Sequence, residues 1–196
     1  MHHIYQTEGI VLSSTAFGEA NKHFWIFTRD LGMITASAQG VRHLKSKLRY
    51  SLQDFSHGTL SLVRGKGGWR ITNAAIESNI SADLRGNPPA AAVAIQGLRL
   101  LKRLLPGEEG NPELFSIMSS ALACLRSEEL SAAELQSVEM ILILRILRNL
   151  GYFPVRENLV SFSESAGWGR ELLSGFEAHR KEALDAINAS LRQTQL

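Results

Sequence analysis

Cysteine is almost absent from this chain of 196 residues, which contains only Cys124. A single thiol can form neither a disulfide within the chain nor a cysteine-based metal site, so a reducing environment such as the cytoplasm is expected. Cys124 stands in the apolar segment ALACL and is expected to be buried as a small hydrophobic residue.

Long apolar runs are also lacking. The densest run, residues 140–153 (MILILRILRNLGYF), is interrupted by Arg145 and Arg148, whereas a membrane span needs about 18 or more apolar residues in a row. The first residues, MHHIYQTEG, do not show the cationic and apolar regions of a secretory signal. With 44% hydrophobic and 20% charged residues, the sequence predicts a soluble globular protein without a membrane partner.

Recognised catalytic motifs are missing too. Neither G-x-S-x-G nor H-E-x-x-H occurs, and the six histidines show no metal-ligand spacing with a carboxylate or thiol. An enzyme acting on nucleic acid would need clustered acidic residues to hold a metal, and Asp30 and Asp54 do not form such a pattern. We therefore expect no catalytic activity, no metal and no other cofactor.

Positive charge, in contrast, is concentrated in the first half of the chain. Residues 1–80 contain nine Lys or Arg and five Asp or Glu, a balance of +4, whereas residues 81–196 contain twelve and fourteen, a balance of −2. The segment QGVRHLKSKLRY (39–50) has four cations, and no carboxylate occurs between residues 31 and 53. Its cations are Arg42, Lys45, Lys47 and Arg49, and Arg64, Lys66 and Arg70 follow near a second turn.

Two interpretations of this basic segment remain open. It can be a solvated loop that contributes only solubility. It can also bind a phosphate backbone, with little preference for sequence. Trp69, Tyr50 and Phe17 would then be candidates for stacking on bases, although each is equally expected in the core.

Short β-branched or aromatic runs separated by turn residues fill the first 80 residues. They predict five or six strands, at residues 9–12, 24–27, 33–38, 59–63 and from 69 onward. The segment RGKGGW (64–69) differs from the phosphate-binding pattern GxxxxGK[ST] and is expected to be a hairpin turn. Strands of this length and spacing are typical of a small barrel.

A helical pattern begins after Asn87-Pro88-Pro89. Apolar residues at intervals of three and four predict helices from residue 90, from 112, from 131 to 150 and from 177 to 192. The sequence thus predicts an α+β protein. We expect residues 1–80 to form a five-stranded OB-fold barrel that binds nucleic acid, and residues 81–196 to form an all-α domain.

The helix at 131–150 is apolar almost all round, apart from Arg145 and Arg148. One interpretation is that both arginines extend their charged ends to water at the rim of the helical bundle. The other is that they form a basic rim around an apolar pocket for an acidic or carboxylate-ended peptide partner.

Several short segments occur in a defined order along the chain. The first group consists of GIVL (9–12), FGE (17–19), FT (27–28) with a later Gly32, AQGVR (38–42) and LQDF (52–55). A second group runs from Glu139-Met140 to Leu150-Gly151-Tyr152-Phe153-Pro154. Together they cover approximately residues 8–80 and 135–155, and in this order they resemble the bacterial RecO recombination mediators.

This resemblance implies a non-enzymatic DNA repair and recombination protein with an OB-fold barrel. Such a protein binds single- and double-stranded DNA, anneals complementary strands and helps to load a recombinase. Its implied partners are a RecR-like protein and the acidic tail of single-stranded-DNA-binding protein. Carried over to this chain, the DNA-binding candidates are the four cations of residues 42–49. Arg64, Lys66 and Arg70 are candidates from charge alone.

The chain also departs from the family pattern. Many members carry a four-cysteine zinc module after the Leu-Gly-Tyr segment, but the corresponding residues here, LVSFSESAGWGREL, contain no cysteine. Zinc is therefore not expected, and the helical domain is expected to be shorter than usual. A protein–protein adaptor that works through its helical domain remains the alternative function.

Overall fold

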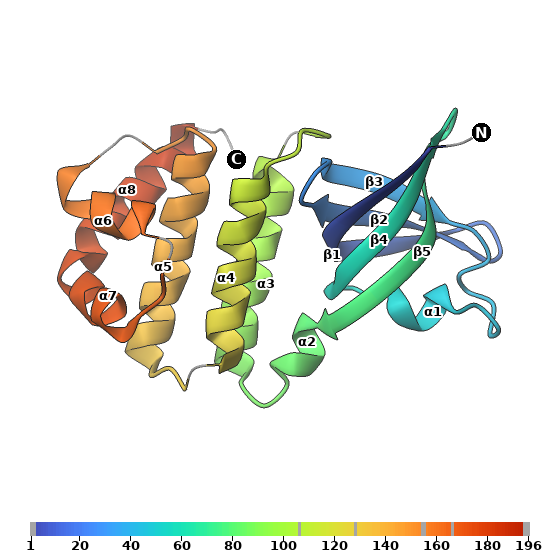
Figure 1. Ribbon diagram of the computed structural model, residues 1–196. Coiled ribbons are helices and arrows are strands. Elements are labelled where there is room, and N and C mark those ends of the chain that lie inside the picture. Colours follow the sequence, from blue (N-terminus) through green and yellow to red (C-terminus); the bar gives the residue numbers. More distant parts are fainter. Residues whose placement is uncertain (1–2, 106, 128, 154–155, 166, 194–196) are drawn as a thin grey trace. The chain divides into compact units, whose positions relative to one another are not determined.

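The computed structural model describes residues 3–105, 107–127, 129–153, 156–165 and 167–193 (Figure 1). The chain divides into two compact units. Residues 1–83 and 104–112 form the first, and residues 84–103 and 113–196 form the second.

The first unit is a five-stranded barrel with the strand order β1-β2-β3-β5-β4 (Figure 1). Its strands are β1 (Ile4–Phe17), β2 (Asn21–Thr28), β3 (Gly32–Ala38), β4 (Ser56–Gly65) and β5 (Gly68–Asn79). All neighbours are antiparallel except β3 and β5, whose short parallel pairing closes the ring. This is the arrangement of an OB-fold, and the predicted α+β class is confirmed.

β1 is longer than the predicted strand at 9–12 because it pairs with two neighbours in succession. Ile4 to Ile10 pair with β4, and Gly9 to Phe17 pair with β2. A register shift between Val11 and Ser13 lies near the changeover, and such bulges let a long strand bend around a small barrel.

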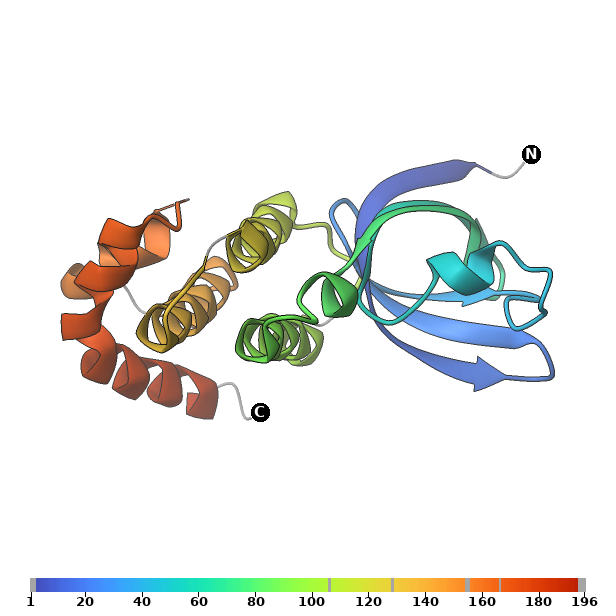
Figure 2. The same cartoon turned by 90° about the horizontal axis from the view of Figure 1, so that it is seen from below.

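Alternating side chains of the strands fill the barrel. Phe24 and Ile26 of β2 and Ile34 of β3 are buried in one apolar cluster, while Trp25, between the first two, is half-buried. The short helix α1 (Leu48–Ser51) lies across one opening of the ring (Figure 2). Leu48 packs against the same cluster, and Leu52 belongs to it.

Residues 104–112 pack on the barrel at the turn between β2 and β3. The Met33 N–H donates to the carbonyl oxygen of Gly107 at 3.0 Å. Gly32 has a φ of +68°, and a Cβ there would lie 2.3 Å from the carbonyl oxygen of Glu109. Only glycine fits this close approach, for which the sequence pattern gave no signal.

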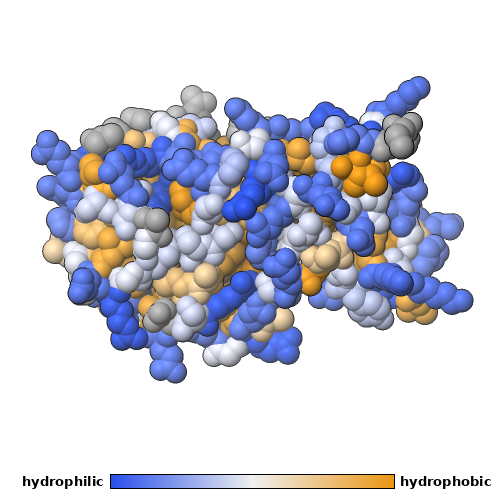
Figure 3. Space-filling model, viewed as in Figure 1, coloured by the Kyte–Doolittle hydropathy of each residue, from blue (hydrophilic) through white to orange (hydrophobic). Residues whose placement is uncertain are grey.

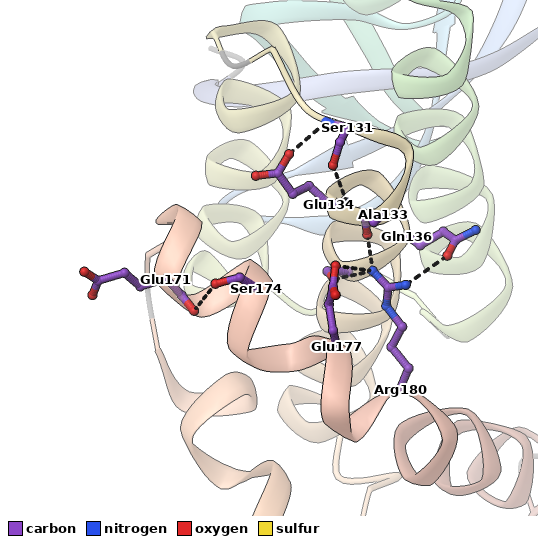
Figure 4. A network of polar contacts seen from close by, with 9 residues as sticks. Ser131, Ala133, Glu134, Gln136, Glu171, Ser174, Glu177 and Arg180 are labelled. Atoms are coloured by element: carbon purple, nitrogen blue, oxygen red, sulfur yellow. Dashed lines mark hydrogen bonds and ion pairs between the residues drawn. The ribbon is translucent and has the colours of Figure 1, made fainter.

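The second unit is helical. Its elements are α3 (Pro88–Leu104), α4 (Pro112–Ser127), α5 (Ala132–Asn149), α6 (Glu157–Glu164), α7 (Arg170–Gly175), η1 (Phe176–His179) and α8 (Arg180–Gln193), and α2 (Ile80–Asp83) precedes them at the end of the barrel. The predicted capping box is present, because Ser131 and Glu134 bond reciprocally at the start of α5 (Figure 4). Gly97 lets α3 approach α5, since a Cβ there would lie 2.8 Å from Leu142.

The C-terminal helix is fastened to α5 by Arg180 (Figure 4). Its guanidinium donates to the carbonyl oxygen of Ala133, to Ser137 Oγ at 3.1 Å and to Gln136 Oε1 at 3.3 Å. In place of the single helix predicted at 177–192, the structure has the 3₁₀ turn η1 followed by α8.

Candidate nucleic-acid interface

The basic segment forms a loop at residues 39–47 that leads into α1. The β1–β2 turn holds this loop at one end of the barrel. The Gly40 N–H donates to Asn21 Oδ1, and the Arg42 N–H donates to the Ala20 carbonyl, both at 2.9 Å. Arg42 Nη1 also donates to the carbonyl oxygen of Glu19 at 3.0 Å. Arg42 thus fixes the loop and still presents an exposed guanidinium.

Arg42 of the loop and Arg49 of α1 meet Lys22 of β2 around a hollow of about 500 Å³. Its polar lining includes Ser14, Lys22, Arg42, Arg49, Gln53 and Asp54. Lys22 Nζ donates to Ser14 Oγ at 3.3 Å, which holds the ammonium group at the opening. Sequence reasoning missed Lys22 because it is an isolated cation within a strand. Its cross-strand partner, Ala38, is the residue from which the basic loop departs.

The four cations of the basic segment, three in the loop and Arg49 in α1, are available for a ligand. All four are exposed, and within the described residues none of them pairs with a carboxylate. Asp54, at the rim of the hollow, forms no ion pair there either. In the view of Figure 3 the barrel surface is mostly hydrophilic, with smaller apolar patches among the polar groups.

The three cations near the β4–β5 hairpin, Arg64, Lys66 and Arg70, do not all lie free beside the basic segment. Arg64 pairs with Glu108 at 2.9 Å, and its Cζ lies 5.1 Å from the centre of the Trp69 ring. Part of its charge is therefore neutralised within the barrel unit, and its role as a DNA-binding candidate stays a prediction. Lys66 is exposed at the tip of the hairpin between β4 and β5. Arg70 is exposed beside Ser37, close to the end of β3 from which the basic loop leaves.

Trp69 is not available for stacking on a base. Its side chain is only 4% exposed and belongs to the barrel core, where Tyr5 meets it edge to face at 5.0 Å. The alternation of β5 explains this, because Trp69 and Ile71 point inward. Phe17 stacks on His23 at 3.9 Å, and both are half-buried. Of the three predicted aromatic candidates, Tyr50 is the most exposed, at 70%.

Arg145 and Arg148 make hydrogen bonds and an ion pair within the helical unit. Arg145 is only 2% exposed, and it donates to the carbonyl oxygens of Phe162 at 3.0 Å and Gly167 at 2.8 Å. Burial lowers its pKa to about 10, so it stays charged at neutral pH. Arg148 donates to Ser163 Oγ at 2.7 Å and pairs with Glu164. Both arginines therefore hold α6 against α5. Both also line a hollow of about 520 Å³, so their role in binding a partner stays a prediction.

Among the described residues, no cluster of three or more His, Cys, Asp or Glu side chains is arranged to hold a metal ion. No helix in the described part of the chain is long and apolar enough to cross a bilayer.

Comparison with known proteins agrees with this architecture. Residues 1–79 match the family described as "Recombination protein O N terminal", and residues 85–168 match "Recombination protein O C terminal". A protein named DNA repair protein RecO from Alkaliphilus metalliredigens is 25% identical over 191 residues, covering 96% of this chain and 76% of that protein. The protein of the same name from Dehalococcoides mccartyi strain CBDB1 is 28% identical over 195 residues, covering 99% and 72%.

A third relative, DNA repair protein RecO from Heliobacterium modesticaldum, is 31% identical over 151 residues, which are 77% of this chain and 53% of that protein. The two family matches divide near residue 80, where the barrel ends and the helices begin. The chain thus belongs to the RecO family of DNA repair and recombination proteins.

Proposed function

We propose that this protein binds single- and double-stranded DNA through its barrel, without catalytic turnover, and promotes the annealing of complementary strands. The observation that carries the proposal is the loop at 39–47. Its three cations, and Arg49 of the adjoining helix α1, are exposed and lack carboxylate partners in the described chain, and backbone hydrogen bonds hold the loop on the barrel. Family membership supports the repair and recombination context.

The chemistry of annealing follows from the charge. Two DNA strands repel each other through their phosphates, and cations that neutralise phosphates release counterions as they bind. The hollow with Lys22, Arg42 and Arg49 offers three positive groups to one stretch of backbone, and Lys45 and Lys47 extend that charge. Such a surface lowers the repulsion between strands without reading their sequence.

The partners that we propose are a RecR-like protein and the acidic tail of single-stranded-DNA-binding protein, with recombinase loading as the outcome. A hollow of about 210 Å³ between α3, α5 and α8 suits the tail better than Arg145 and Arg148 do. Leu100, Leu142 and Leu191 contribute apolar lining, and the charged lining consists of Arg99, Arg103 and one carboxylate, Glu139. An acidic peptide with an apolar end would match both features.

Binding to fluorescein-labelled single-stranded oligonucleotides, measured by anisotropy at 50 and 200 mM salt, tests the DNA proposal. We expect tight binding at low salt, little dependence on base sequence, and a loss of affinity of about 10²-fold or more at high salt if five or more phosphates are contacted. Absence of binding at low salt would refute a DNA-binding function and favour the adaptor alternative.

A further inference from the structure

Two large apolar side chains project into solvent from the basic segment. Leu44 is 79% exposed, and Tyr50 is 70% exposed. Leu44 occupies a central position of a turn closed by the Ser46 N–H and the His43 carbonyl oxygen at 3.0 Å. Polar residues and glycine are usual at such positions, so folding of the turn does not require a leucine there.

The other apolar residues of this segment behave differently. Val41 and Leu52 are buried in the barrel core, and Leu48 packs against that core. The segment therefore uses these three residues as anchors and directs Leu44 and Tyr50 away from the barrel. A preceding turn, closed by the His43 N–H and the Gly40 carbonyl at 3.1 Å, restrains the chain next to Leu44.

We propose that Leu44 and Tyr50 recognise unpaired bases at the junction between single-stranded and duplex DNA. Tyr50 stacks on an unpaired base, and Leu44 inserts beside the last base pair, while Lys45, Lys47 and Arg49 hold the adjacent phosphates. This inference rests on the proposed DNA-binding function and names the DNA structure that the site prefers. Base faces are the apolar part of DNA, and exposed aromatic and aliphatic side chains bind them by stacking and by insertion.

Charge complementarity favours a nucleic acid as the ligand of this segment. Four exposed cations without described carboxylate partners lie within eight residues of Leu44 and Tyr50 in the sequence, so the ligand that fits carries regularly spaced negative charge next to apolar surface. An anionic membrane also combines these features, but membrane-surface helices present a long continuous apolar face. α1 has only four residues, and the anchors Val41 and Leu52 are directed into the barrel.

The test compares the full-length protein with Leu44→Ser, Tyr50→Ser and the double variant. Leu184→Ser, which changes an exposed leucine of α8, is the matched control. Three labelled probes of equal total length are used: a single strand, a blunt duplex, and a partial duplex with a single-stranded overhang and 2-aminopurine at the junction. Vesicles containing anionic phospholipid form a fourth arm.

We expect the unchanged protein to bind the partial duplex about tenfold more tightly than the single strand, and to alter the 2-aminopurine fluorescence. The double variant should lose this preference and the fluorescence change, while its salt dependence on the single strand stays unchanged. An unaltered preference in the double variant would overturn the inference but leave the DNA-binding function standing. Binding to vesicles that depends on Leu44, without junction preference, would also overturn it.

Discussion

Replacing Lys45, Lys47 and Arg49 together with glutamine is expected to weaken binding of a single-stranded oligonucleotide by about 100-fold at 50 mM salt. Each phosphate contact contributes roughly 0.7 to the slope of log K against log salt on single strands, so the slope should fall by about 2. Arg42 is kept because its guanidinium holds the loop to the β1–β2 turn. Anisotropy titrations at four salt concentrations measure both quantities.

A matched control comes from the helical unit. Lys181 and Arg192 are exposed cations of α8, and the variant Lys181→Gln/Arg192→Gln should leave the DNA affinity within about twofold. Circular dichroism should show that both variants fold, because all the replaced side chains are exposed. If the loop variant binds DNA as tightly as the unchanged protein, the basic segment serves only solubility. The adaptor interpretation would then gain support.

The Arg145→Ala substitution is expected to lower the free energy of unfolding by about 3–5 kcal/mol, a larger loss than the same substitution at Arg148 would cause. Phe162 lies in the last turn of α6, where carbonyl oxygens have no N–H partner within the helix. Arg145 supplies that donor, and its Cζ also lies 4.1 Å from the centre of the Trp168 ring. Alanine would remove these contacts and leave a cavity in the helical unit.

Urea unfolding followed by tryptophan fluorescence and circular dichroism measures this loss. Arg145→Lys keeps a charge and one hydrogen bond but not the planar stack. The stability of this variant should therefore lie between that of the alanine variant and that of the unchanged protein. Arg148→Ala is the comparison on the same helix. Its ion pair with Glu164 is partly exposed, so it should cost about 1 kcal/mol. An Arg145→Ala protein within 1 kcal/mol of the unchanged one would contradict the structural role.

Local patterns were sufficient to predict most of the fold. The strand that contains Phe24 and Ile26, the glycine-rich hairpin and the capping box at Ser131 all depend on residues close in sequence. Alternation, turn chemistry and helix caps act over a few residues, so they are readable without a structure. The short helices α6 and α7 were not predicted, because they are brief and owe their stability to packing.

The site was predicted less completely, because it depends on contacts between distant segments. The loop cations were found from their density, but Lys22 joins them only through the pairing of β2 with β3. Arg64 appeared free in the sequence, yet the segment 104–112 brings Glu108 to it. Trp69 could face either way until the register of β5 was known.

Hydrogen–deuterium exchange of the full chain, with and without a saturating single-stranded oligonucleotide, tests the central claim most directly. Slower exchange is predicted in peptides covering residues 39–54, with smaller changes at the β1–β2 turn. Exchange in α7 and α8 should not change. Protection confined to residues 113–193, with the basic loop unaffected, would contradict the assignment of DNA binding to the barrel.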